Sequence, residues 1–171
     1  MIWQTPRMIG VFLVLVAVAP GCSGFHPLYG TTEDSSPVAG ELAAVAIPEP
    51  ETRLGQIIRN DLMSSMRPAG TAAPDRYTLA MTIQAQEEKA IESATIDRVL
   101  RRTVRLNVSF ALTEHGSDRI VYRGKTFSQA SYDEVGQSFA DLQAKTDAVE
   151  RAAHEVSVDI RTRLAAHFSA C

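Results

Sequence analysis

The sequence predicts an α+β fold, a two-layer sandwich in which about four strands form a sheet and two helices pack on one face. Apolar and polar residues alternate with a period of two along segments 77–86 and 104–113. Apolar residues recur at helical spacing in segments 52–66 and 138–168. With 171 residues, of which 45% are hydrophobic and 22% charged, the chain has the size and composition of one globular domain.

The first predicted strand and helix lie between residues 42 and 66. Segment 42–47 (LAAVAI) is a short apolar run closed by Pro48, which is typical of a buried or edge strand. A helix is predicted from Thr52 to the residues before Pro68, because proline disfavours helical backbone in the residue that precedes it. Its apolar stripe consists of Leu54, Ile57, Ile58, Leu62 and Met66.

Three further strands follow. Segments 77–86 and 104–113 alternate in the way that a half-buried strand requires. Residues 114–118 (EHGSD) are typical of a hairpin turn, so 119–131 is predicted as the returning strand. Tyr132 then lies in the link to the last helix, where we predict a structural role, with the ring packed on the sheet and the hydroxyl bonded locally.

The last element is a long helix predicted from Ser138 to about Phe168. At 1.5 Å per residue it is about 45 Å long, so part of it is expected to extend beyond the sheet. Its predicted apolar stripe consists of Leu142, Val149, Ala152, Ala153, Val156, Ile160, Leu164 and Phe168. Two amphipathic helices cover one face of the sheet, and the other face, rich in Thr, Asn, Gln, Ser and Arg, is predicted to meet water or a polar partner.

The N-terminus has the pattern of a lipoprotein signal peptide over residues 1–21. Arg7 provides a positive charge, residues 9–19 (IGVFLVLVAVA) form an apolar core too short to span a bilayer, and small residues precede Cys22. This pattern resembles a bacterial lipobox, which predicts lipidation of Cys22 and anchoring by acyl chains. The alternative is an ordinary cleaved signal, with Cys22 in a disulfide with Cys171.

The residues after Cys22 predict a flexible acylated tether over 22–40, because they are rich in Gly, Pro, Ser and Thr. A single α+β domain is predicted from 41 to 171. Ser23 follows the cysteine where aspartate is the usual inner-membrane retention signal, which favours an outer-membrane location on the periplasmic side. The net charge of −3 argues against nucleic-acid binding.

Candidate catalytic patterns in the chain have structural explanations. Ser138 lies in a sequence similar to a nucleophile elbow, but Ser138 with Asp141 is more typical of a helix capping box. His154-Glu155 begins like a zinc-protease helix, but Val158 occupies the place of the second histidine. We therefore predict no catalytic residue, no metal ligand and no cofactor.

Four arginines within eight residues form the main candidate binding site. Arg98, Arg101, Arg102 and Arg105 lie at the start of the clearest strand of a chain with net negative charge. Guanidinium groups match phosphates in a bidentate manner, so these arginines are candidates for binding the phosphates of a glycolipid. The alternative is that they pair with Glu87, Glu88 or Glu92 as ordinary surface ion pairs.

Short motifs in a fixed order resemble one family. Cys22 followed by 25–30 (FHPLYG) is similar to the mature N-terminus of the lipopolysaccharide-assembly lipoprotein LptE, in its alphaproteobacterial branch. Residues 55–62 (GQIIRNDL) are similar to the first helix of that family. The approach to the last helix and the helix itself are similar at 131–133 (SYD), 138–140 (SFA), 147–148 (DA) and 151–153 (RAA).

The resemblance implies a non-enzymatic outer-membrane lipoprotein that plugs the LptD β-barrel, assists its assembly and helps deliver lipopolysaccharide to the cell surface. A polar sheet face is compatible with the polar lumen of a large barrel. The arginines would then meet lipopolysaccharide phosphates. One alternative is a periplasmic auxiliary lipoprotein of an ABC-type lipid transport system, and another is a secreted hydrolase that uses Ser138.

Overall fold

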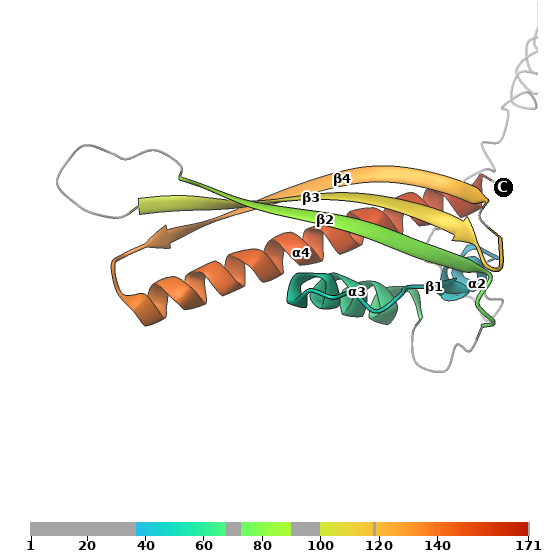
Figure 1. Cartoon of the computed structure of the whole chain (residues 1–171), viewed down its shortest axis with the longest axis horizontal. Helices are drawn as coiled ribbons and strands as arrows, with labels where there is room; N and C mark the ends of the chain where they lie inside the picture. Colours follow the sequence, from blue (N-terminus) through green and yellow to red (C-terminus); the bar gives the residue numbers. More distant parts are fainter. Residues whose placement is uncertain (1–36, 68–72, 90–99, 118, 171) are drawn as a thin grey trace, which may run out of the picture. The chain divides into compact units, whose positions relative to one another are not determined.

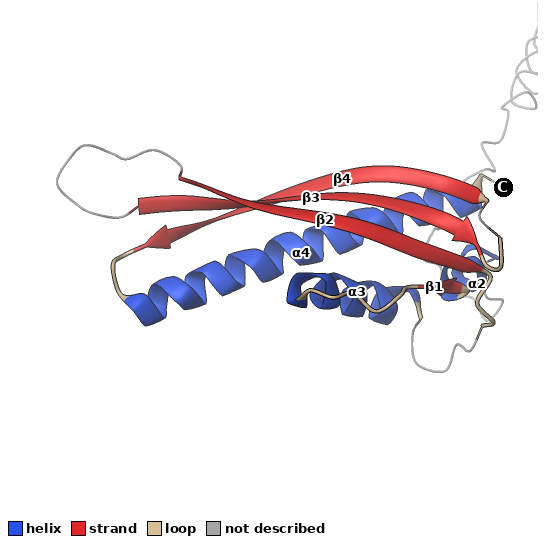
Figure 2. Cartoon of the chain, viewed as in Figure 1, coloured by secondary structure: helices blue, strands red, loops and turns tan. Residues whose placement is uncertain are grey.

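A computed structural model describes residues 37–67, 73–89, 100–117 and 119–170. The elements in these ranges are drawn in Figure 1 and coloured by type in Figure 2. In chain order they are α2 (Pro37–Ala43), β1 (Val45–Ala46), α3 (Arg53–Met66), β2 (Tyr77–Lys89), β3 (Leu100–Glu114), β4 (Ile120–Glu134) and α4 (Ser138–Ser169).

The predicted α+β sandwich is confirmed, and it contains four strands in the order β1-β2-β3-β4. β1 is parallel to β2, whereas β2, β3 and β4 form an antiparallel meander. α3 and α4 lie side by side on one face of the sheet (Figure 1). The opposite face, which we call the open face, carries no helix in the described part of the chain.

The prediction of a strand over 42–47 was wrong for most of its length. Leu42 and Ala43 end α2, and the strand pairing is limited to Val45 and Ala46. The run is apolar because Leu42, Ala43 and Val45 are all buried, and burial produces the same sequence pattern in a short helix as in a strand. α2 also begins at Pro37, inside the range 22–40 predicted for the tether.

The strands are longer than the alternation predicts. β2 runs on to Lys89, β3 begins at Leu100 and β4 ends at Glu134. These added ends are charged, so they lack the apolar alternation that marks the middle of each strand. A strand of 15 residues spans about 50 Å and a helix of 32 residues about 48 Å. The expected extension of the last helix beyond the sheet is therefore wrong, because α4 and the strands have matching lengths.

The core lies between the sheet and the helices. Even-numbered residues of β3 from Val104 to Leu112 point into it and are buried. α3 and α4 complete it with Ile58, Leu62, Ala152, Val156, Ile160 and Leu164, each 0% exposed. Leu142, predicted in the same stripe, is 63% exposed, because the first turns of α4 lie beyond the end of α3.

The starts of the two long helices differ in how they are capped. The Thr52 hydroxyl accepts a hydrogen bond from the Gly55 N–H at 3.1 Å, as predicted for the start of α3. At α4 the N-cap residue is Gln137, not Ser138, so the predicted capping box is wrong. The Asp141 carboxylate instead accepts a hydrogen bond from the Val135 N–H at 2.8 Å, which fastens the loop before the helix to its first turn.

Small and polar side chains cover most of the open face. Strand alternation places residues such as Thr82, Gln84, Asn107 and Ser109 there, opposite the core.

The helices of the described ranges include none with the length and apolarity needed to cross a bilayer.

Candidate functional site

The predicted arginine cluster is divided between the two faces of the sheet. Arg98 lies outside the described residues. Arg101 and Arg105 are on the open face, whereas Arg102 shares the core side with Val104, because successive strand residues point to opposite faces. The three described arginines therefore do not converge on one ligand position.

The two open-face arginines each meet an acidic side chain. Arg101 makes a bidentate pair with Asp133 of β4, with Nε–Oδ1 at 2.8 Å and Nη2–Oδ2 at 3.2 Å. Arg105 Nη1 lies 3.4 Å from Glu88 Oε1 of β2. The alternative interpretation of the sequence, in which the arginines form ordinary surface ion pairs, is therefore correct for Arg105 and Glu88.

Arg102 belongs to a network on the helix side of the same sheet end. Its Nε donates to Glu134 Oε2 at 2.7 Å, and its Nη1 lies 3.6 Å from Glu87 Oε1. Glu87 also accepts hydrogen bonds from the Tyr132 hydroxyl at 2.5 Å and from Lys145 Nζ of α4 at 2.6 Å. Glu87 therefore links β2, β3, β4 and α4, and Tyr132 has the buried ring and bonded hydroxyl that a structural role requires.

The pKa values in this network follow from these contacts. The hydrogen bond from Lys145, and then the one from Tyr132, lowers the pKa of Glu87 below its usual value. Burial, together with the hydrogen bond to Glu87, raises the pKa of Tyr132 to about 12, so its hydroxyl remains a donor at any physiological pH. The hydrogen bond from Arg101 lowers the pKa of Asp133.

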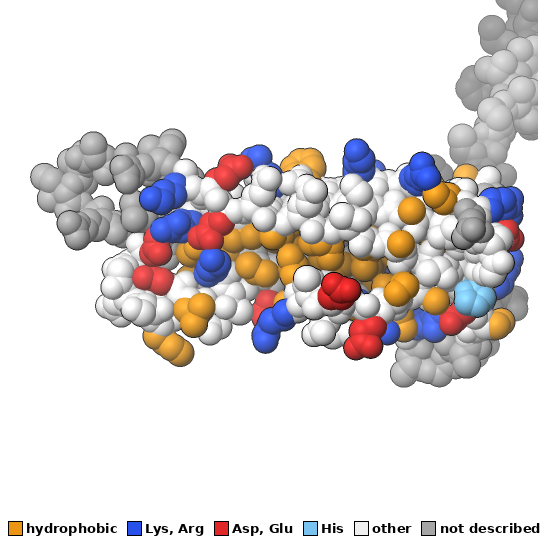
Figure 3. Space-filling view, viewed as in Figure 1, with side chains coloured by type: hydrophobic (Ala, Val, Ile, Leu, Met, Phe, Trp, Pro, Cys, Tyr) orange, Lys and Arg blue, Asp and Glu red, His pale blue; other side chains and the backbone are white. Residues whose placement is uncertain are grey.

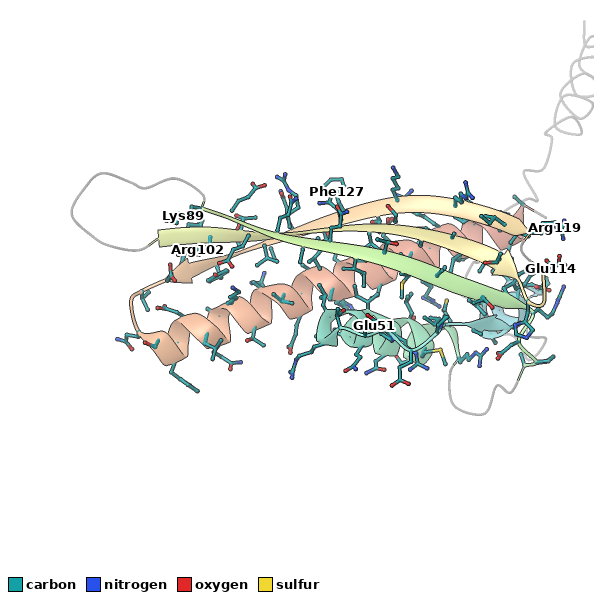
Figure 4. All side chains as sticks on the ribbon, viewed as in Figure 1. Glu51, Lys89, Arg102, Glu114, Arg119 and Phe127 are labelled. Atoms are coloured by element: carbon teal, nitrogen blue, oxygen red, sulfur yellow. The ribbon has the colours of Figure 1, made fainter. Side chains whose placement is uncertain are left out.

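Charges in this part of the structure compensate one another. We define the paired-charge cluster as Arg101, Arg102, Arg105, Lys145, Glu87, Glu88, Asp133 and Glu134, in which four cations face four carboxylates. Figure 4 shows Arg102 and Lys89 at this end of the strands. A phosphate would have to displace a carboxylate here, and Arg101, whose side chain is 63% exposed, is the arginine best placed for such an exchange.

Replacing Glu87 with glutamine is expected to lower the free energy of unfolding by about 1 kcal/mol at pH 7, because the Lys145 and Arg102 contacts lose their charge assistance. The folded-state pKa of Glu87 is below the unfolded value of 4.5. Its stabilising contribution is therefore present above pH 4.5 and is lost as the pH falls through the lower value. Chemical denaturation of E87Q between about pH 7 and 3 should show a flatter pH dependence than wild type.

The matched control is E150Q, since Glu150 is exposed and has no ion pair among the described residues. It should leave both the stability at neutral pH and its acid dependence unchanged. Equal behaviour of E87Q and E150Q would contradict the role given to Glu87.

The catalytic candidates are not brought together. His154 Nδ1 lies 3.3 Å from Asp61 of α3, whereas Glu155 accepts a hydrogen bond from Ser128 of β4, so the two residues face different neighbours. No group of three metal-ligating side chains occurs among the described residues. Ser138 lies near Asp141 at the start of α4, in a depression whose described lining includes no histidine.

A second charged surface was missed by the sequence analysis. Arg123 and Lys125 lie on the open face of β4, are exposed, and have no ion-pair partner within the described ranges. They flank a shallow depression of about 470 Å³, whose floor includes Ala80, Thr82 and Ser109. Phe127, 68% exposed, points away from the helices on the same strand (Figure 4). The alternation of residues 123–127 was the signal that could have identified this surface.

Comparison with solved structures supports the fold. The chain is similar to a lipoprotein candidate from Caulobacter crescentus CB15, with a TM-score of 0.66 and 23% identity over 79% of this chain and 97% of that one. It is also similar to rare lipoprotein B from Shewanella oneidensis, with a TM-score of 0.52 and 15% identity over 71% and 92% of the two chains. A minor lipoprotein from Acinetobacter baumannii matches with a TM-score of 0.51 and 13% identity over 71% and 88%.

No curated protein sequence matches the chain. The family model described as LptE, lipopolysaccharide-assembly, matches residues 42–164. This range extends from the end of α2 into the last turns of α4, so it includes the whole sheet and most of the helical layer. The chain therefore belongs to the LptE family of lipopolysaccharide-assembly proteins.

Proposed function

We propose that this protein is an outer-membrane lipoprotein that plugs the LptD β-barrel, assists its assembly and helps deliver lipopolysaccharide to the cell surface. The family match supports the link to lipopolysaccharide assembly. The structural observation that carries the plug role is the open face, a long sheet surface of small and polar side chains that no helix of the described chain covers. Such a surface can hydrogen-bond to the polar lumen of a large barrel.

Anchoring is the second part of the proposal. Residues 1–21 would be removed as a signal peptide, Cys22 would carry the acyl chains, and the following residues would form a tether up to the start of α2 at Pro37. Several acyl chains give stable attachment to a leaflet without a membrane-spanning helix. Cys22, Cys171 and residues 23–36 lie outside the described residues. Mass spectrometry of the mature N-terminus distinguishes lipidation of Cys22 from the alternative Cys22–Cys171 disulfide.

The role is proposed to be non-enzymatic, with recognition carried by surfaces. Arg98, Arg101, Arg102 and Arg105 remain the proposed lipopolysaccharide phosphate-binding residues. The ion pairs of Arg101 and Arg105 with carboxylates do not forbid this, because exposed pairs contribute only about 0–1 kcal/mol each. Lipopolysaccharide phosphates could therefore replace Asp133 at Arg101 at little cost in stability.

Affinity purification of the tagged full-length protein from detergent-solubilised membranes tests the proposal. We expect a large outer-membrane β-barrel to co-purify in stoichiometric amount, and recovery of an inner-membrane permease complex instead would favour the ABC-transport alternative.

The C22S variant, which removes the proposed acylation site, should still fold but should leave the membrane fraction. Replacing Arg98, Arg101 and Arg102 with alanine should weaken binding of purified lipopolysaccharide and leave the fold intact by circular dichroism, although the loss of the Arg102 contacts with Glu87 and Glu134 should lower the thermal unfolding temperature. Unchanged lipopolysaccharide binding would refute the role of these arginines.

A further inference from the structure

The outer edge of β4 has no neighbouring strand in the part of the chain that the structure describes. β4 has 15 residues and is the last strand in the sheet order, so β3 is its only strand neighbour in the described ranges. An edge strand presents N–H and C=O groups that can pair with another chain.

The hydrogen bonds fix which residues point outward. In an antiparallel strand, the backbone groups of alternate residues point to opposite sides. The Glu114 N–H of β3 donates to Arg119 O at 3.0 Å, so even-numbered residues of β3 bond toward β4. The β4 residues that pair with these β3 residues, from Tyr122 onward, are even-numbered as well. The backbone groups of odd-numbered β4 residues therefore point outward.

An independent contact supports this assignment. The Ser131 carbonyl accepts a hydrogen bond from Arg151 Nη2 of α4 at 3.2 Å, so it points away from β3. Between Tyr122 and Ser131, the outward positions are Arg123, Lys125, Phe127 and Gln129, and their backbone groups have no such contact in the described chain. The side chains of these residues all lie on the open face, because alternation places odd-numbered β4 residues there.

The chemistry of this row favours an acidic extended segment. Arg123 and Lys125 have no carboxylate partner among the described residues, and Ala111 and Ser109 are their neutral neighbours on β3. Phe127 exposes 68% of its surface two residues further along. Figure 3 shows Lys and Arg side chains, in blue, projecting from the sheet side of the molecule. A bound phosphate would contact the two cations, but it would leave the outward backbone groups of β4 and the Phe127 ring without a partner.

We propose that the outer edge of β4 from Arg123 to Gln129 receives an extended segment of the barrel partner as an additional strand. This segment carries carboxylates opposite Arg123 and Lys125 and an apolar side chain beside Phe127. Strand addition derives affinity from backbone hydrogen bonds and selectivity from alternate side chains. Cross-strand charge pairs and aromatic pairs further stabilise an added strand. The inference rests on the proposed function, which supplies the barrel.

The first test removes one outward N–H. In Q129P, proline deletes a donor that points away from β3, which edge strands tolerate, and Q129A controls for loss of the side chain. In affinity purification of the full-length protein from membranes, Q129P should recover about tenfold less barrel than Q129A, with similar circular dichroism spectra. Equal recovery of the barrel by the two variants would overturn the proposal.

The second test removes the two cations. R123Q/K125Q should also lower recovery of the barrel about tenfold, whereas R53Q/R163Q, which removes two exposed charges from α3 and α4, should stay within about twofold of wild type. If R123Q/K125Q weakens recovery and Q129P does not, the cations contact an anionic group such as a lipid phosphate without an added strand, and the proposal is wrong.

Hydrogen exchange on the wild-type complex tests the added strand without any variant. Amides of Lys125, Phe127 and Gln129 should exchange rapidly in the free protein and become protected with the barrel bound, whereas Thr126 and Ser128 should be protected in both states. Unprotected odd-numbered amides in the complex would refute the added strand even if Q129P failed to fold. Failure of the wild type to recover any barrel would instead refute the proposed function.

Discussion

Replacing Gly124 with alanine is expected to lower the free energy of unfolding by about 1–3 kcal/mol, the range for overpacking a closely packed core. Gly124 lies on the core side of β4, directly opposite Phe110 of β3. A Cβ at this position would lie 2.3 Å from Phe110 Cζ and 2.8 Å from Cε1. The phenyl ring is only 3% exposed, so it must move within the core to make room. Urea denaturation of the purified domain measures the effect.

The control substitution is expected to have the opposite sign. Gly40 lies in α2, is exposed, and has no heavy atom within 4 Å of an added Cβ. G40A should stabilise the protein by about 0.5–1 kcal/mol, because alanine has the higher helix propensity and restricts the unfolded chain. Combining G124A with F110L should recover part of the loss, since the smaller side chain relieves the contact. A G124A protein as stable as wild type would show that Phe110 does not require glycine opposite it.

Leu164→Ala is expected to cost about 2–5 kcal/mol, the largest effect of any single substitution considered for α4. Leu164 is 0% exposed and belongs to the core cluster between the sheet and the helices. Truncation removes buried methyl groups and leaves a cavity that the surrounding close-packed core fills only in part. The thermal unfolding temperature and the urea midpoint should both fall.

Leu142→Ala provides a matched comparison on the same helix. Leu142 is 63% exposed, so the same change there should alter the free energy of unfolding by less than about 0.5 kcal/mol. Comparable losses at the two positions would mean that the first turns of α4 are covered in solution, against the arrangement seen here.

The middle of each long element could be predicted from the sequence, because burial on one face produces a clear period. β3 is the best example, since each even-numbered residue from Val104 to Leu112 is both apolar and buried. The prediction of element bounds failed in segments that are buried on all sides or that have no buried apolar face. Leu42 and Ala43 are buried in a helix too short to show a period, and the charged strand ends near Lys89 and Arg101 carry no apolar signal.

The candidate site could be predicted only in part, because its contacts depend on strand register. Strand alternation places Arg105 on the polar face, and the same alternation, extended to the start of β3, separates Arg102 from Arg101 and Arg105. The contact of Tyr132 with Glu87 joins residues 45 positions apart, and no local pattern indicates it. Arg123 and Lys125 were missed because an isolated cation on a strand has the same sequence pattern whether or not a carboxylate lies beside it.

The order of elements along the chain has a consequence for biogenesis. α4 packs against β3, β4, α3 and α2, yet it follows all of them in sequence. While the polypeptide is being synthesised or secreted, the apolar side of the meander lacks α4, which packs against β3 and β4, until residues 138–169 have emerged. We therefore expect nascent chains of this protein to expose apolar surface for longer than those of a protein whose helices alternate with its strands, and we expect a premature stop before Ser138 to yield an aggregation-prone product.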